Sequence, residues 1–174
     1  MSVPAVPPTG TNASATYPEQ VTTKFEIRSA RPDEAAELSD LALRSKAHWG
    51  YDEAFLESCR EELTIPLDRV VAKRTQAAVT PEGRILGFGT IEGEPPAGEL
   101  GMLFVDPDVI GHGVGGALFS HLAATAVDLG FHRLTIASDP NAEPFYLARG
   151  AVRIGAVPSG SAQGRVLPLL ALAL

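Results

Sequence analysis

The chain has 174 residues, which suits a single domain, and 45% of them are hydrophobic, which is enough for a full core. Its formal net charge of −7, with no cluster of Lys and Arg, argues against a nucleic-acid-binding protein. The lone cysteine, Cys59, excludes an intrachain disulfide, and the four scattered histidines form no recognisable metal-binding motif, so we expect no metal site.

The two ends of the chain differ in composition. Residues 1–22 are rich in Pro, Thr, Ser and Ala and lack the features of a secretory signal peptide. We expect them to form a disordered lead to a single domain over residues 23–174. The last nine residues, VLPLLALAL, are too few to span a bilayer and favour a buried strand. These features predict a cytoplasmic protein that does not act at a membrane.

The first half of the domain is predicted to contain a strand, two helices and a hairpin. Alternation over residues 23–30 predicts the strand, and apolar residues at helical spacing predict a helix over 32–46. A second helix over 52–63 begins at Asp52, whose side chain suits the N-cap. The sequence PEG at 81–83 lies between two apolar segments and predicts a β-hairpin.

The second half of the domain alternates between strands and helices. The predicted elements are a strand over 98–107, a helix over 113–129, a strand over 132–138, a short helix over 141–150 and two final strands. The full order is β-α-α-β-β-β-α-β-α-β-β. A hairpin followed by a β-α-β crossover predicts an α/β domain with a mixed sheet and helices packed on it.

Four glycines lie within GHGVGG, residues 111–116, where a strand ends and a helix begins. Helix N-termini present unpaired N–H groups and bind anions, and glycine lets a phosphate approach the backbone. No Lys or Arg lies in this loop, so backbone amides would hold most of the anion. The dinucleotide fingerprint GxGxxG is one alternative, although that motif follows its strand directly. A tight packing turn without a ligand is the other.

Two segments resemble motifs of the GCN5-related N-acetyltransferases, the GNAT superfamily. The sequence LGMLFVDPDVIGHGVGGAL, at 100–118, is similar to the family's acyl-CoA-binding motif, in which a strand leads to [QR]xxGx[GA]. Gly113 and Gly115 align with the two small positions, whereas Ile110 stands where the family generally has Gln or Arg. The sequence DPNAEPFYLARGA, at 139–151, looks like the family's next motif.

The resemblance implies a fold, an activity and a cosubstrate. The implied fold is a mixed, mostly antiparallel, twisted sheet of about six or seven strands flanked by about four helices. The implied activity is direct transfer of the acetyl group of acetyl-CoA to a primary amine of a small molecule or peptide. The implied cofactor-binding residues are Leu103, Phe104, Val105, Gly111, His112, Gly113, Val114, Gly115, Gly116 and Asn141, with Asn141 equally suited to capping its own helix.

Two side chains are candidates for catalysis. Tyr146 falls where the family often places a tyrosine near the thioester sulfur, and there it would act as the general acid. Glu99 occupies the strand position where some members have a catalytic Glu, and it would act as the base. The alternatives are that Tyr146 only packs in the core and that Glu99 is only solvated.

The acceptor site is expected near the connection between the first two helices. This segment holds Trp49 and Tyr51, whose aromatic faces suit an aromatic or cationic acceptor, although both residues could instead fill the core. Two other functions stay open: a non-catalytic acyl-CoA-binding or regulatory module on the same fold, and a nucleotide-binding oxidoreductase. A homodimer through the apolar last strand is a further expectation.

Overall fold

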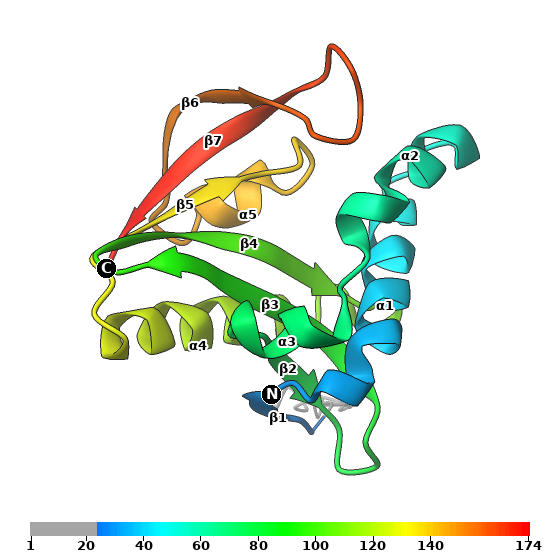
Figure 1. Cartoon of the computed structure of the whole chain (residues 1–174), viewed down its shortest axis with the longest axis vertical. Helices are drawn as coiled ribbons and strands as arrows, with labels where there is room; N and C mark the ends of the chain where they lie inside the picture. The colour runs from blue at the N-terminus through cyan, green and yellow to red at the C-terminus, as the bar shows by residue number, and fades with distance from the viewer. Residues whose placement is uncertain (1–23) are drawn as a thin grey trace, which may run out of the picture.

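The computed structural model describes residues 24–174, and the lead predicted over residues 1–22 lies outside them. The described chain forms one seven-stranded sheet in the order β1-β2-β3-β4-β5-β7-β6 (Figure 1). The strands are β1 (Glu26–Ser29), β2 (Gln76–Val79), β3 (Ile85–Glu94), β4 (Ala97–Val105), β5 (Arg133–Ala137), β6 (Val152–Pro158) and β7 (Val166–Ala173). All neighbouring strands are antiparallel except β4 and β5, so the predicted mixed, mostly antiparallel sheet is confirmed.

Five α-helices accompany the sheet, one more than the sequence pattern predicts. They are α1 (Ala35–Ala47), α2 (Glu53–Leu63), α3 (Leu67–Ala72), α4 (Val114–Asp128) and α5 (Glu143–Leu147), with short 3-10 helices η1 (Pro32–Glu34) and η2 (Pro107–Val109). The additional helix is α3. It is only six residues long and has one buried residue, Val70, so it carries no readable apolar period.

The helix starts follow from local hydrogen bonding. Asp52 caps α2 as predicted, because its carboxylate accepts the backbone N–H of Phe55 at 2.8 Å. The idea that Asn141 caps α5 is wrong, since the N-cap position is Ala142 and no side chain caps it. Asp139 takes that role one turn earlier, where its carboxylate accepts the N–H of Asn141 at 3.0 Å.

Adjacent residues of the strands show that helices cover both faces of the sheet. Ala77 packs with the cores of α1, α2 and α3, whereas its neighbour Ala78 packs with α4. In the same way Met102 contacts the first group of helices, while Leu100 packs against α4 and Tyr146 of α5. Strand β4 therefore forms the floor between two separate apolar cores.

Strand β4 changes register in its middle. Leu103 pairs with Gly89 and Leu100 pairs with Ile91, so two residues of β4 lie opposite the single residue Thr90. The backbone N–H of Met102 is satisfied by the Thr90 hydroxyl at 2.9 Å. Such a bulge bends a strand and increases its twist.

The parallel pair β4 and β5 separates soon after it begins. Only Ala97, Gly98 and Glu99 of β4 pair with β5, opposite Arg133 to Thr135. Beyond that point the two strands run apart (Figure 1). This separation leaves a gap between the carboxyl ends of β4 and β5 in the middle of the sheet. The apolar cores on the two faces of the sheet both border this gap.

Candidate active site

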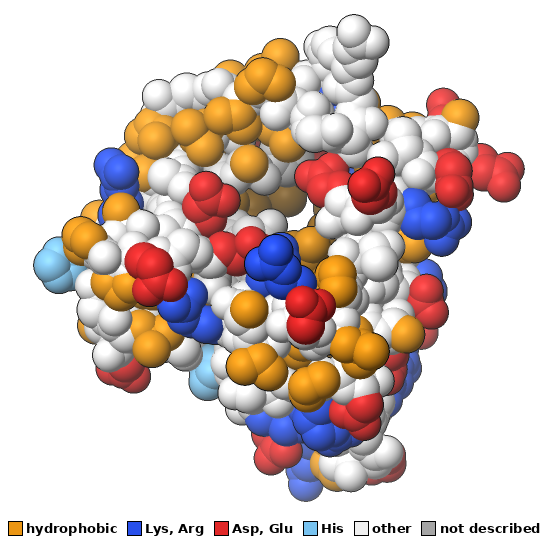
Figure 2. All heavy atoms as spheres, viewed as in Figure 1, with side chains coloured by type: hydrophobic (Ala, Val, Ile, Leu, Met, Phe, Trp, Pro, Cys, Tyr) orange, Lys and Arg blue, Asp and Glu red, His pale blue; other side chains and the backbone are white. Residues whose placement is uncertain are grey.

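A cavity of about 700 Å³ occupies the gap between β4 and β5. Its walls come from these two strands, the loop before α4, helix α5, the connection between α1 and α2, and the loop between β6 and β7. Figure 2 shows the hollow on this face, with hydrophobic side chains in its depth and acidic and basic side chains around it. Segments far apart in the sequence thus meet around one space of ligand size.

Most of the predicted cofactor-binding residues line this cavity. They are Leu103, Phe104, Val105, Gly111, Gly113, Gly115, Gly116 and Asn141. The two others do not line it, because Val114 is buried in the core beneath the loop and His112 points to solvent. The sequence motif therefore marks one wall of the cavity with few exceptions.

The glycine loop, residues 111–116, is shaped by left-handed backbone at the start of α4. Gly113 is the N-cap of α4 with φ of +85°, a conformation that side-chain-bearing residues rarely adopt. No atom lies within 4 Å of the position that a Cβ on Gly113 would take, so the loop is open toward the cavity. The first turn of α4 carries no acidic residue, which leaves its N–H groups suited to an anion.

Arg149 supplies a positive charge that the glycine loop lacks. Its guanidinium lies 3.7 Å from the centre of the Phe145 ring and donates to the Phe145 carbonyl at 3.0 Å. A Cβ on Gly116 would lie 2.9 Å from Nη2 of Arg149, so this cation sits against the first turn of α4. Arg149 also lines the cavity, and sequence reasoning gave it no role.

Asp106, which precedes the glycine loop, links this part of the chain to helix α1. Its buried carboxylate accepts from Arg44 at 3.1 Å, from the N–H of Asp108 at 3.1 Å, and pairs with Arg84 at 3.3 Å. Burial alone would raise the pKa of Asp106, but these donors outweigh it and hold the pKa below its ordinary value. The residues that precede the loop are thereby held in one position.

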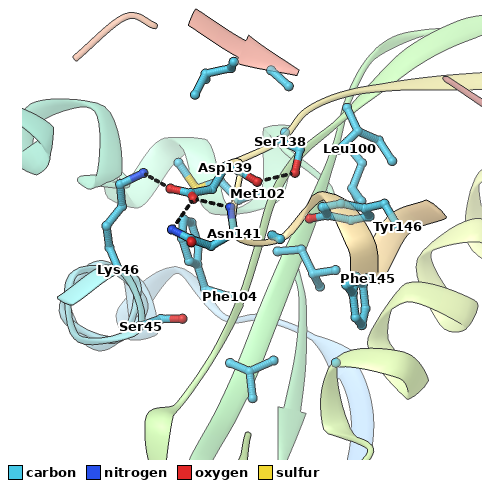
Figure 3. A pocket seen from close by; sticks show the side chains of 18 of the residues that line it. Ser45, Lys46, Leu100, Met102, Phe104, Ser138, Asp139, Asn141, Phe145 and Tyr146 are labelled. Carbon is cyan, nitrogen blue, oxygen red and sulfur yellow. Dashed lines mark hydrogen bonds and ion pairs between the residues drawn. The ribbon is translucent and has the colours of Figure 1, made fainter. Parts of the chain in front are cut away.

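Tyr146 is buried at the cavity wall, with its ring packed between Phe119 at 6.0 Å and Phe145 at 5.1 Å between ring centres. Within the described residues its hydroxyl forms no hydrogen bond, and it points into the cavity (Figure 3). Burial raises the pKa of the Tyr146 phenol well above its ordinary value, and the charge of Asp139 adds to the rise. The phenol therefore stays protonated, as a proton donor must.

Glu99 is exposed and lines the same cavity. It lies at the point where β4 and β5 separate, paired by register with Thr135 on one side and Glu92 on the other. Glu92 is itself neutralised by Lys73, whose ammonium donates to it at 2.9 Å and 3.0 Å. Glu99 is thus an exposed carboxylate at the wall of the cavity.

A cluster of polar side chains, the Asp139 network, contributes a second set of residues to the cavity wall. Its members come from α1, the α1–α2 connection, the β5–α5 loop and the end of the β6–β7 loop: Lys46, Tyr51, Asp139, Asn141 and Arg165. Tyr51 donates to Asp139 at 2.9 Å, and Lys46 and Arg165 donate to it at 3.2 Å and 3.1 Å. Figure 3 shows Lys46, Asp139 and Asn141 joined in this way.

The donors of the network set the charge state of Asp139. Burial by itself would raise the pKa of Asp139, but the N–H of Asn141, the charge of Lys46 and the hydrogen bonds from Tyr51 and Arg165 lower it overall. Burial, together with the bond to Asp139, raises the pKa of the Tyr51 phenol. Asp139 is therefore an anion and Tyr51 a neutral donor at neutral pH.

The two aromatic residues predicted for the acceptor site have different positions. Trp49 lines the cavity and is 45% exposed, so the alternative that it fills the core is wrong. Tyr51 packs on Phe55 at 4.4 Å between ring centres and directs its hydroxyl to Asp139 and Arg165 rather than forming part of the cavity wall. Tyr51 thus supports the residues that face the cavity.

Neither a metal-binding cluster nor a membrane-spanning helix occurs among residues 24–174. No group of three or more His, Cys, Asp or Glu side chains is arranged to hold a metal ion in this part of the chain. Among the helices described, none has the length and apolar character needed to cross a membrane.

Comparison with known proteins identifies the relatives of this chain. Residues 34–161 match the family model described as an acetyltransferase (GNAT) domain. A GCN5-related N-acetyltransferase from Rhodopseudomonas palustris is 25% identical, with a TM-score of 0.72 over 88% of this chain and 98% of that one. The comparison with curated proteins gave no match.

Two similar structures contain coenzyme A. The PaiA N-acetyltransferase from Thermoplasma acidophilum, solved with coenzyme A, is 17% identical, with a TM-score of 0.73 over 87% of this chain and 99% of that one. The N-acetylglutamate synthase from Neisseria gonorrhoeae, solved with coenzyme A and N-acetyl-glutamate, is 20% identical, with a TM-score of 0.62 over 87% of this chain and 35% of that one. Both share the fold described above.

Proposed function

This chain belongs to the GNAT acetyltransferase family, and from that premise we propose that it transfers the acetyl group of acetyl-CoA to the primary amine of a small molecule or peptide. The observation that carries the proposal is the cavity between β4 and β5, which joins a helix start suited to an anion to the unpaired hydroxyl of the buried Tyr146. A cosubstrate with a diphosphate at one end and a thioester at the other matches both features.

The residues present fit acetyl-CoA along its length. The N–H groups of the glycine loop and the guanidinium of Arg149 would hold the diphosphate, with Arg149 compensating for Ile110. Residues 103–105 of β4 have no strand partner on the β5 side, so their main-chain groups are free to bond the amide-containing arm of the cosubstrate. This arrangement would aim the thioester toward Tyr146.

The chemistry requires one proton acceptor and one proton donor. The amine nitrogen attacks the thioester carbonyl, a C–N bond forms, and the C–S bond breaks. Glu99 would take the proton that the amine loses, directly or through a water molecule. Tyr146 would give its proton to the departing sulfur, since its raised pKa keeps the phenol protonated.

Two measurements test this function. Calorimetry with acetyl-CoA should give saturable binding, and a free-thiol assay with a panel of primary amines should show release of coenzyme A that depends on the amine. Binding without release on any amine would instead support the non-catalytic acyl-CoA-binding module. Absence of heat at millimolar acetyl-CoA, with folded protein, would overturn both.

The same calorimetry also tests the oxidoreductase alternative. NAD should give no saturable heat, because the glycine loop is separated from its strand by η2 and does not follow β4 directly as the dinucleotide motif does. Tight binding of NAD, with none of acetyl-CoA, would reverse this assignment.

A further inference from the structure

The Asp139 network holds two cations and one anion. The ammonium of Lys46 and the guanidinium of Arg165 both donate to the same oxygen, Oδ2 of Asp139, at 3.2 Å and 3.1 Å. The three side chains are only 13%, 18% and 15% exposed. Within residues 24–174 no second carboxylate lies within 4 Å of either cation. The network therefore carries one more positive charge than negative.

Both cations also have N–H groups that form no hydrogen bond. The Nη1 group of Arg165 is buried and has no hydrogen-bond partner, while its Nη2 group serves Tyr51 and Asp139. Lys46 uses one of its three N–H bonds, on Asp139. A buried charged donor without a partner costs free energy unless a ligand satisfies it. A ligand oxygen at this place would remove that cost.

The other acidic residues near the cavity do not neutralise the surplus positive charge of Lys46 and Arg165. Glu62 is exposed and lies beside Gly160, 3.9 Å from the position of a Cβ there, but it forms no ion pair with Lys46 or Arg165. Glu99 stands at the point where β4 and β5 separate. Lys46 and Arg165 thus line the cavity and carry one more positive charge than Asp139 balances.

We propose that the amine acceptor carries a carboxylate group, which binds beside Lys46 and Arg165. This inference rests on the proposed function and adds the substrate class: small molecules that hold both a primary amine and a carboxylate. A carboxylate balances the one surplus charge, and its two oxygens suit the planar guanidinium of Arg165 and the free N–H bonds of Lys46. Because Nη1 is enclosed, the guanidinium would have to turn toward the cavity for a carboxylate oxygen to reach this group.

A binding experiment tests the carboxylate site without turnover. The probes are N-acetylglycine and N-acetylglycinamide, which differ only in the charged group, measured by calorimetry on protein with and without coenzyme A. N-acetylglycine should bind at least tenfold more tightly, since a hydrogen bond to a charged group is worth about 1.5–3 kcal/mol. Equal affinity for the two probes would overturn the proposal.

Substitution assigns the preference to its residues. Arg165→Gln should remove most of the preference for N-acetylglycine, and Arg165→Lys should retain part of it, while acetyl-CoA binding stays unchanged. Arg60→Gln is the matched control, because Arg60 is 57% exposed on α2 and pairs only with Glu57. A preference that survives Arg165→Gln would place the anion site elsewhere and contradict the proposal.

Turnover separates this inference from the proposed function. With amino acids and their amides as paired acceptors, the wild-type kcat/KM should favour the free carboxylate at least tenfold, and Arg165→Gln should lower it for the acids alone. Efficient acetylation of amines without preference for a carboxylate would leave the proposed function standing and refute the carboxylate site. Absence of any acetyl-CoA binding would refute the function, whereas the N-acetylglycine measurement on the free protein still decides the site.

Discussion

The glycine loop and the Asp139 network both contribute to the wall of one cavity, and they are built in different ways. The glycine loop relies on main-chain N–H groups and left-handed glycine backbone, so few side-chain identities matter there. The Asp139 network relies on charged side chains from four segments, each needing the others. Under the proposed function, the glycine loop would bind the cosubstrate and tolerate sequence change, while the Asp139 network would bind the acceptor and set specificity.

The largest effect is expected at Tyr146, which lines the same cavity. Tyr146→Phe should lower kcat about 100-fold or more and leave the Kd for acetyl-CoA nearly unchanged, because it removes only the proton donor. The matched control is Tyr51→Phe, which should raise the acceptor KM instead, since Tyr51 supports the Asp139 network. In the wild type no loss of activity from ionisation of Tyr146 should occur up to pH 10, because its pKa is raised. Unchanged turnover in Tyr146→Phe would rule out the acid role.

The next effect is on stability, through Asp139. Asp139→Asn leaves Lys46 and Arg165 without their shared carboxylate and should lower the free energy of unfolding by about 2 kcal/mol. Because the pKa of Asp139 is lowered by folding, its contribution is present above about pH 4 and is lost as the pH falls below that value. Urea denaturation between pH 2.5 and 7 should show a shallower loss for the variant; parallel curves would contradict the linkage.

A smaller effect is expected from a substitution that disturbs the backbone conformation of the glycine loop. Gly113→Ala forces an alanine to adopt φ of +85° and should weaken acetyl-CoA binding about tenfold, as the strain of about 1–2 kcal/mol displaces the loop. Gly83→Ala is the matched control, because Gly83 has φ of +93° in the β2–β3 turn and does not line the cavity. Both variants should lose similar thermal stability, but only the first should lose affinity for acetyl-CoA in calorimetry.

The smallest effect tests whether a side chain assists the glycine loop. Arg149→Ala should raise the Kd for acetyl-CoA about fivefold, and the difference should shrink in high salt because Arg149 is exposed. A loss larger than that of Gly113→Ala would show that the glycine loop depends on side-chain charge, against the comparison drawn above. Arg153→Ala, on the exposed strand β6, serves as the control for a lost surface charge.

Sequence motifs located residues that line one cavity where those residues are contiguous in the chain, and the functional roles of these residues stay predictions. The fold, the glycine loop and the positions of Tyr146 and Glu99 at one cavity follow from motifs that lie within single β-α units. Arg149 was missed because its contact with the start of α4 depends on how α5 packs, with the Phe145 ring in between. Helix α3 was missed because one buried side chain gives no period.

The Asp139 network was beyond prediction for a different reason. Its hydrogen bonds join Tyr51 to Asp139 across 88 positions, Lys46 to Asp139 across 93 and Arg165 to Tyr51 across 114. Only the folded sheet brings these segments together, and no local pattern marks Arg165 in a loop of small polar residues. Tyr51 was selected for its aromatic face, which does contact Phe55, Lys46 and Arg165, but its hydroxyl bonds to Asp139 and Arg165 had no sequence signal.

The short ladder between β4 and β5 leaves two open strand edges inside the sheet. Open edges usually invite pairing with other chains and aggregation. Here an extended cosubstrate would act as the missing strand, so loading should slow amide hydrogen exchange at residues 103–105 and 136–138 and suppress aggregation on heating. Acetyl-CoA would then both supply the acetyl group and complete the sheet. In cells with little acetyl-CoA, the protein would be in the form that is least protected against aggregation.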